Sequence, residues 1–368
     1  NYGFHGGGLQ VDAGTLTLMD ATFTGNSAGA GGGMETGYAA TATLSRVSFL
    51  ANTAYNGGGV SAGFEMTYTN VIFAANASQQ YGGAILNGSN GATQLTNVTV
   101  AGNSAGYKGG AIANLTAGVL SIRNSVLYGN VTGEGLQVYS YLAPVVNDSL
   151  IEGGWVGGLN IARLNPRFIR EPGTNGSADT GDLHLQPGSP ARSVGNNATC
   201  AADDRDGVAR PRTAGDQCDM GAYEYTGLLL NAPGNRPQTG APVAGVFEAP
   251  PGDVLVQAPQ GAVTATTELA FTAGQNGDAR VSAAYRQVNI FTLDAWQSDL
   301  QVGNFRFAAP VTLVIGYERA DVSEDEAQAL IVRAYDPATG EWTSDGIEVV
   351  AQDAEARTVT VATIRTGA

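Results

Sequence analysis

Several residue types are scarce in this chain of 368 residues, and each scarcity excludes a class of protein. Lysine occurs once, as Lys108, and the formal net charge is -15, so the basic clusters that bind nucleic-acid phosphates are missing. No run of 18 apolar residues is present, so we expect no transmembrane helix. No signal peptide opens the sequence, and we expect one to have been removed from a secreted protein.

Cysteine and histidine are almost as rare. Cys200 and Cys218 are the only cysteines, and a disulfide is the default for such a pair in a secreted protein. A free thiol pair or a metal site is the alternative, although no other cysteine is available to complete a zinc site. His5 and His184 are far apart in the sequence and do not favour a histidine metal centre.

Glycine, by contrast, is abundant and belongs to a repeat. Five times a hydrophobic residue, two small or variable residues and an asparagine recur, and glycines soon follow each asparagine. The five units are Phe23–Asn26, Phe49–Asn52, Phe73–Asn76, Val100–Asn103 and Leu127–Asn130. Their asparagines are 26, 24, 27 and 27 residues apart (26 to 52, 76, 103 and 130). A period in this range with glycine punctuation predicts a β-solenoid.

Stacked coils would place equivalent positions of successive repeats in columns about 4.8 Å apart. The alternation of inward positions slips by one residue at the sixth position before each repeat asparagine, so we expect a corner there. Asparagine tolerates the left-handed conformation of a corner, and stacked amides can bond to one another. We therefore predict two asparagine ladders. The first is Asn26, Asn52, Asn76, Asn103 and Asn130, and the second is Asn70, Asn97, Asn124 and Asn147.

The paired Phe-x-x-Asn and Gly-Gly-aliphatic motifs resemble those of the polymorphic outer-membrane proteins over roughly residues 1–150. That family consists of right-handed parallel β-helices on bacterial surfaces and works mainly in adhesion. The string from Asn165-Pro-x-Phe168 to Cys218-Asp-Met-Gly-Ala-Tyr-Glu224 resembles the choice-of-anchor Q domain, which ends β-helical regions of secreted bacterial proteins. Arg192-Ser193 departs from that pattern. We expect the segment to cap the last coil, whose backbone groups would otherwise be unpaired.

The sequence after residue 225 predicts a linker and a second domain. Residues 226–250 are rich in Pro, Gly and Ala and are expected to form a linker. Residues 251–368 carry short alternating runs separated by turn signals, which predict an antiparallel β-sandwich with one helical turn within 323–329. The expected fold class is thus all-β. A right-handed parallel β-helix spans 1–225, with its closing segment at about 165–225, and the β-sandwich follows the linker.

Catalysis is the first function to weigh, because paired carboxylates on one face of a β-helix can cleave polysaccharides. Glu35 and Glu65 stand at different distances from their repeat asparagines and share no column. Asp20 and Arg46 do share one, but an exposed pair is more often a surface salt bridge worth under about 1 kcal/mol. We therefore expect no catalytic residues, and a polysaccharide lyase or hydrolase is the alternative.

Three kinds of ligand site are also suggested by the residues. Tyrosines before the glycine clusters, with the lysine beside one of them, would either stack on sugar rings or pack on one another. Acids near the cysteines would either bind calcium or bond to nearby backbone and arginines. Four asparagines head glycosylation sequons in expected loops. The glycan candidates are Tyr55, Tyr81, Tyr107 and Lys108, the calcium candidates Asp203, Asp204 and Asp206, and the sequon asparagines Asn87, Asn114, Asn175 and Asn197. No other cofactor is expected.

The third function is structural. The chain begins within a repeat, at residues 1–8, and an exposed coil edge is a template for another chain. Covering that edge with a different surface of a neighbour would give a head-to-tail filament, unless the contact closes into a ring. A fragment of a longer protein is the alternative explanation. The sequence thus predicts a non-enzymatic extracellular structural or adhesive protein, with a second copy of itself as its main partner and a glycan or cell-surface ligand as another.

Overall fold

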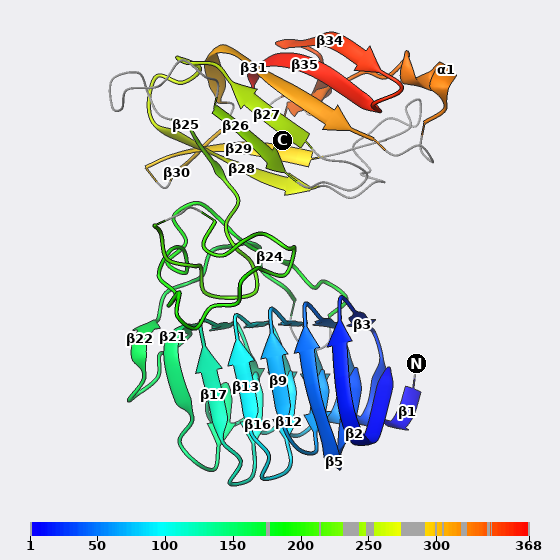
Figure 1. The fold of residues 1–368 in the computed structure, drawn as a ribbon, viewed down its shortest axis with the longest axis vertical. Helices are drawn as coiled ribbons and strands as arrows, with labels where there is room; N and C mark the ends of the chain where they lie inside the picture. Colours follow the sequence, from blue (N-terminus) through cyan, green and yellow to red (C-terminus); the bar gives the residue numbers. More distant parts are fainter. Residues whose placement is uncertain are drawn as a thin grey trace. The chain divides into compact units, whose positions relative to one another are not determined.

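The structure is a computed structural model that describes residues 2–173, 177–212, 215–230, 243–247, 254–273, 291–298, 300–303, 305–317, 322–336, 339 and 341–366 (Figure 1). The chain divides into two compact units, residues 1–225 and 226–368. Both are built from β-strands, and among the described residues the one helix is the single turn α1 (Glu324–Ala327), which Ser323 caps. The predicted all-β class is confirmed.

The first unit is a parallel β-solenoid of about six turns, as the repeat predicts. From Thr53 onward, each full coil contributes four short β segments, whereas Leu9–Met19 and Met34–Ser45 each run unbroken through two of these positions in earlier coils. The residues after each repeat asparagine pair as well and form an additional sheet. That additional sheet consists of β1 (Tyr2–His5), β4 (Ser27–Ala30), β7 (Thr53–Asn56), β11 (Ala77–Ser78), β15 (Ser104–Ala105) and β19 (Val131–Thr132).

The other strands of the solenoid join in one large sheet that wraps around the core. After the glycines come β8 (Val60–Ala62), β12 (Ile85–Asn87), β16 (Ile112–Asn114) and β20 (Val138–Ser140). The front sheet, labelled across the lower half of Figure 1, consists of β2 (Leu9–Met19), β5 (Met34–Ser45), β9 (Met66–Thr69), β13 (Thr93–Thr96) and β17 (Leu120–Arg123). The flank sheet consists of β3 (Thr22–Thr24), β6 (Ser48–Leu50), β10 (Ile72–Ala74), β14 (Thr99–Ala101) and β18 (Val126–Tyr128). β21 (Val145–Ile151) continues both of these sheets and pairs with β22 (Leu159–Ala162).

Equivalent residues of successive coils stack in the core. The rings of Phe23, Phe49 and Phe73 lie parallel, with centroids 4.9 and 5.0 Å apart, which is the spacing that strand pairing imposes. Val100 and Leu127 continue this column in register. Such aromatic pairs contribute about 0.5–1.5 kcal/mol each beyond the area they bury.

The corners of the coil have distinct backbone requirements. At the corner between the front and flank sheets, φ is positive in every coil and lies between 47° and 54°. At the repeat asparagine, the positive φ belongs to the residue before it, such as Ala51 or Ala75. At the glycine corner, a Cβ on Gly58 would lie 2.2 Å from the carbonyl oxygen of Gly83, so only glycine fits.

The closing segment, residues 165–225, lies against the flank sheet, and this corrects the expectation that it caps the last coil. Its buried residues Phe168, Leu183 and Met220 form one cluster with Ile72 and Val126 of the flank sheet. Two of its stretches pair with each other as β23 (Phe168–Arg170) and β24 (Asp182–Leu185). The outward residues of the flank sheet are apolar, and burying them favours a cover along the side of the solenoid. The sequence pattern alone did not show which face of the solenoid the closing segment would cover.

The second unit contains two antiparallel sheets whose side chains share one buried core, as predicted for a sandwich. The first sheet is β25 (Leu228–Leu230), β28 (Thr267–Ala273), β29 (Phe291–Gln297) and β30 (Leu300–Val302). The second is β26 (Val243–Phe247), β27 (Val254–Ala258), β31 (Arg306–Gly316), β35 (Thr358–Arg365) and β34 (Ile347–Asp353). A hairpin of β32 (Ala334–Asp336) and β33 (Glu341–Thr343) completes the described strands.

The expected linker 226–250 is corrected in part, because β25 and β26 fall within it. β25 pairs with β28, and β26 pairs with β27. Both are apolar stretches that reach the sheets, and composition alone hid them among prolines and glycines. The rest of the expected linker that follows β25 lies outside the described residues.

Candidate functional site

The first asparagine ladder runs through the inside of the solenoid. From Asn26 to Asn130, each Nδ2 donates a hydrogen bond to Oδ1 of the next asparagine, at 2.8–3.0 Å. Each Oδ1 also accepts from the backbone N–H of the preceding asparagine at 2.9–3.1 Å. At the last coil, Asn130 donates to Oε1 of Gln137 at 3.0 Å, a terminating residue that the repeat did not reveal. The ladder is thus structural, and its polar groups are occupied.

The second row of asparagines does not bond along the axis as predicted. Asn70 donates to the carbonyl oxygen of Asp203 at 2.8 Å, and Asn124 donates to Oγ1 of Thr199 at 3.0 Å. Asn97 donates to the carbonyl oxygen of Asp219 at 3.2 Å. These amides face outward at the corner, so they bind the closing segment and fasten it to successive coils.

Asn147 is not the next member of this row. It pairs with Arg123, so Asp148 occupies the corner with φ of 47°. The Oδ2 of Asp148 accepts from Nδ2 of Asn196 at 3.2 Å, again in the closing segment. The predicted position was one residue off, because only strand pairing fixes the register of this coil.

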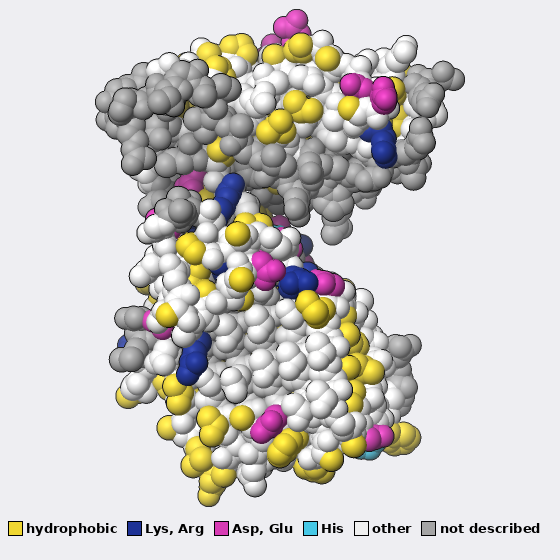
Figure 2. All heavy atoms as spheres, viewed as in Figure 1, with side chains coloured by type: hydrophobic (Ala, Val, Ile, Leu, Met, Phe, Trp, Pro, Cys, Tyr) yellow, Lys and Arg dark blue, Asp and Glu magenta, His cyan; other side chains and the backbone are white. Residues whose placement is uncertain are grey.

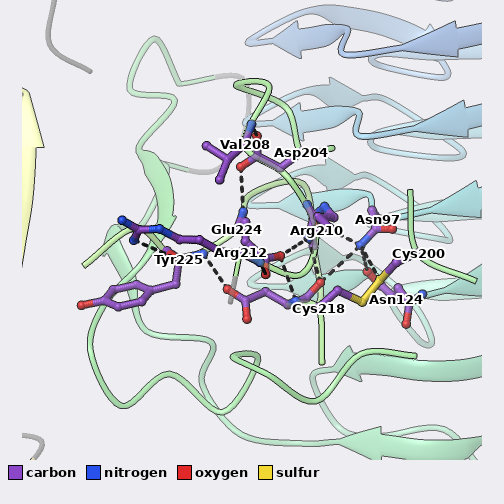
Figure 3. A network of polar contacts seen from close by, with 12 residues as sticks. Asn97, Asn124, Cys200, Asp204, Val208, Arg210, Arg212, Cys218, Glu224 and Tyr225 are labelled. Carbon is purple, nitrogen blue, oxygen red and sulfur yellow. Dashed lines mark hydrogen bonds and ion pairs between the residues drawn. A yellow bond between two sulfur atoms is a disulfide. The ribbon is translucent and has the colours of Figure 1, made fainter. Parts of the chain in front are cut away.

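A buried ion pair organises the closing segment (Figure 3). Nη1 of Arg210 lies 2.9 Å from Oε2 of Glu224, and their side chains are 0% and 4% exposed. Arg210 also donates to the carbonyl oxygens of Asp219 and Gly221 at 2.9 and 2.8 Å. Burial lowers the pKa of Arg210 and raises that of Glu224, and the attraction between the two charges opposes both shifts.

The disulfide expected between Cys200 and Cys218 is present, and it closes the loop that meets Asn97 and Asn124 (Figure 3). Cys218 donates its backbone N–H to Oδ1 of Asn197 at 2.7 Å. The disulfide therefore holds together the two stretches that contact the corner asparagines.

His184 makes polar contacts that the sequence did not predict. Its Nδ1 lies 2.6 Å from Oδ1 of Asp182 and its Nε2 lies 2.9 Å from Oδ2 of Asp206, while its ring stacks on Tyr223 at 3.7 Å. Burial disfavours the charged ring, but the hydrogen bonds to the two carboxylates outweigh it and raise the pKa of His184 to about 10. The histidine is therefore an imidazolium that joins β24 to the loop at 203–210.

The calcium candidates are each engaged by protein donors. Asp204 accepts from the backbone N–H groups of Asp206 and Val208 with Oδ1 and from that of Glu224 with Oδ2, all at 2.8 Å. Asp203 pairs with Arg46 at 3.3 Å, and Asp206 pairs with the histidine described above. Across the described parts of the chain, no three His, Cys, Asp or Glu side chains gather as a metal site requires.

Two acids of the solenoid, Glu35 and Asp20, each contact a basic side chain. Glu35 lies 2.8 Å from Nδ1 of His5, and burial raises its pKa. Asp20 and Arg46 form the ion pair that their shared column suggested, with Nε to Oδ1 at 2.7 Å. Asp20 is largely exposed, and its hydrogen bond to Arg46 lowers its pKa. The arrangement is that of a surface salt bridge.

The tyrosines before the glycine clusters lie along one edge of the solenoid. Tyr81 and Tyr107 pack edge to face with centroids 5.4 Å apart, and Nζ of Lys108 lies over Tyr107 at 4.9 Å and over Tyr139 at 4.6 Å. Tyr55 is 50% exposed. Tyr81 and Tyr107 thus pack on each other, as one of the two alternatives predicts, while Tyr55 faces solvent.

Two of the sequon asparagines do not lie in accessible loops, contrary to the expectation from the sequence. Asn87 and Asn114 are fully buried, and Nδ2 of Asn87 donates to Oδ1 of Asn114 at 3.0 Å in a short third ladder. The loop begins after them, so neither is an accessible glycosylation site. Asn197 is exposed, but its Nδ2 donates to the carbonyl oxygen of Asp216 at 2.8 Å. Asn175 lies outside the described residues.

The single helix in the described part of the chain lacks the length and apolarity that crossing a membrane demands. The chain matches no protein-family model, and searches of curated proteins and of solved structures return no similar protein. The fold is therefore established by the structure, and the two family resemblances depend on the repeat and closing motifs.

Proposed function

We propose that this chain is a non-enzymatic extracellular protein with a structural or adhesive role on a bacterial surface. The observation that carries the proposal is the front sheet, which is regular, is left uncovered by the closing segment within the first unit, and has outward side chains that are mostly small and uncharged. An enzyme site needs a concave pocket with a few convergent reactive groups. An extended sheet instead suits attachment to an extended surface. The motifs shared with the polymorphic outer-membrane proteins support the same role.

The state of the titratable groups also favours a non-enzymatic role. His184, Arg210 and Glu224 have shifted pKa values, and each bonds to a partner inside the closing segment. Perturbed groups of this kind also occur in structural ion-pair networks. Because each of these three groups is engaged by a protein partner, their perturbation supports a structural role rather than a catalytic one.

Adhesion is tested with the purified full chain on immobilised cell-wall polysaccharide, glass and whole cells. We expect retention on at least one of these surfaces without release of soluble sugar products. A chain that is retained on none of them, or one that releases products from a polysaccharide, would contradict the proposal.

Self-association is the second part of the proposal. It is supported by exposed apolar side chains in the last coil and the turn after it, a place where Figure 2 shows hydrophobic side chains on the surface. These residues are Leu136, Tyr141, Leu142, Val145 and Val156. If another part of a second copy covers this end, the contact is head-to-tail and propagates into a fibre unless it closes into a ring.

Electron microscopy and sedimentation at increasing protein concentration test this step. We expect fibres or short oligomers from the wild-type chain and monomers from Leu142→Asp combined with Val156→Asp. Val350→Asp, at an exposed position of β34 in the second unit, is the matched control and should still assemble. Monodisperse short rods at high concentration would rule out the fibre.

Polysaccharide binding remains a second candidate function because of one observation. Tyr55 and Phe4 present exposed aromatic rings, 50% and 84% exposed, on the residues preceding two glycine clusters. Exposed aromatic faces stack on sugar rings. This candidate is tested by the tyrosine substitutions described in the Discussion.

A further inference from the structure

The front sheet carries a regular array of hydroxyl groups. Along its strands, inward hydrophobic residues alternate with outward residues, and the burial of β5, β9 and β13 follows this alternation. In the first three coils, six of the outward residues are threonines, which we call the threonine face. They are Thr15, Thr17, Thr41, Thr43, Thr67 and Thr69.

Strand pairing sets the threonine face in two dimensions. Thr17, Thr43 and Thr67 are register partners in three consecutive strands, and Thr15 pairs with Thr41. The row of Thr69 continues with Thr96 on the next coil and with Ser45 on the previous one, so hydroxyls extend over four coils. Neighbours are about 4.8 Å apart across the strands and about 6.7 Å apart along them, because strands pair at the first distance and alternate residues are separated by the second.

These hydroxyls are free to bind a ligand. Within the described chain, no hydrogen bond to another protein group involves the side chain of any residue of the threonine face, whereas Thr53 on the neighbouring sheet donates to Oγ of Ser27. Threonine is β-branched and stiff at χ1, so the positions of its hydroxyl and methyl groups are defined in advance. A rigid array of this kind loses little entropy when it binds.

The composition of the face limits the ligand. Although the chain has a net charge of -15, Figure 2 shows the middle of this face almost without charged or hydrophobic side chains. The threonines themselves offer an ionic ligand no counter-charge and a sugar no aromatic ring to stack on. Strand propensity alone does not explain the choice, since valine and isoleucine favour strands equally. The ligand must be uncharged, form hydrogen bonds and repeat in two dimensions.

We propose that the threonine face binds ice. The oxygen atoms on surfaces of ice repeat in two directions at distances close to those of the threonine rows, so hydroxyls and the waters held between methyl groups can merge with the lattice. Each contact is weak, but a match in both directions adds many of them at once. This inference depends on the proposed adhesive function and names the surface to which the solenoid attaches.

The test uses the full chain in ice-recrystallisation and ice-partition assays. We expect the wild-type chain to suppress recrystallisation and to enter a growing ice phase, and Thr43→Tyr combined with Thr67→Tyr to lose both properties, because bulky rings break the flat array. Thr24→Tyr is the matched control, since Thr24 is an exposed strand residue on the flank sheet, and it should behave as the wild type. Circular dichroism checks that the double variant retains its β-structure.

Two results would overturn the assignment to ice. One is a folded double variant that suppresses recrystallisation as well as the wild type does. The other is a wild-type chain that does not act on ice. If that inactive chain binds crystalline cellulose or chitin through the same threonines, the ice ligand is wrong while the adhesive function stands. If it binds no surface, both proposals fail.

Discussion

Nδ2 of Asn76 donates a hydrogen bond to Oδ1 of Asn103, 2.8 Å away and one coil further along the solenoid. The same Nδ2 donates to the carbonyl oxygen of Phe49 at 2.8 Å, and Oδ1 of Asn76 accepts from Asn52. One side chain therefore joins three coils. Because it is fully buried, no water can replace these bonds when the amide is removed.

Asn76→Ala should therefore lower the free energy of unfolding by about 1–3 kcal/mol, since it leaves buried donors and acceptors unpaired. Urea unfolding followed by circular dichroism, with hydrogen exchange of the solenoid amides, measures the change. Gln94→Ala, at an exposed position of β13, is the control and should have little effect. Equal effects of the two substitutions would mean that the ladder does not stabilise the solenoid.

Arg210→Met should destabilise the closing segment strongly, by about 3–5 kcal/mol, because it leaves the buried Glu224 carboxylate without its partner. Adding Glu224→Gln removes that charge and should recover part of the loss. Thermal unfolding of both variants gives the comparison, and Arg46→Met, in an exposed pair, should shift Tm much less. A double variant no more stable than the single one would show that the uncompensated charge is not the cause.

The pH dependence of stability should reveal His184. Its pKa rises from 6.5 to about 10 on folding, so its stabilising contribution is complete below about pH 6.5 and is lost as the pH rises through about 10. The Tm of the wild type should exceed that of His184→Gln at neutral pH, and the two values should converge in alkaline buffer. A constant difference across this range would show that the ring does not titrate there.

Calcium should leave the stability of the closing segment unchanged. The oxygens of Asp204 accept three backbone N–H bonds, and Asp203 and Asp206 each pair with a basic side chain. A cation would have to displace these donors. Thermal unfolding with excess calcium and with a chelator measures the effect, and a Tm that rises with calcium would contradict the expectation.

If the chain binds polysaccharides through its aromatic edge, replacing Tyr55, Tyr81 and Tyr107 together with alanine should abolish that binding without unfolding the solenoid. Tyr141→Ala removes another exposed ring outside this edge and serves as the control. Glycan-array binding and circular dichroism provide the two readouts. Binding that survives the triple substitution would exclude this edge as the glycan site.

The period of the repeat was sufficient to predict the solenoid, because stacking gives every coil the same demands at the same position. Phenylalanine, asparagine and glycine recur where the core, the inner ladder and the tight corner need them. The disulfide of Cys200 and Cys218 could also be expected, since no other cysteine competes. These features depend on local pattern or on elimination, and the sequence displays both.

The repeat pattern did not predict the hydrogen-bond partners of the asparagines outside the inner ladder. Asn97 at the corner looks like a ladder member in the sequence, but it contacts the carbonyl oxygen of Asp219, 122 residues later. Asn87 looks like a loop sequon, but its amide is buried against Asn114. An asparagine has the same donors and acceptors in each case, and only the packing around it selects the partner.

The sequence by itself determined the coil, its inner columns and the places where the backbone turns, because these follow from residues that repeat at a fixed period. Only the tertiary structure decided that the closing segment covers the flank sheet, that Arg210 and Glu224 meet inside it, and that this segment leaves the threonines of the front sheet uncovered. The physical reason is that these outcomes depend on contacts between segments without a shared period, and such contacts are settled by which apolar surfaces bury each other.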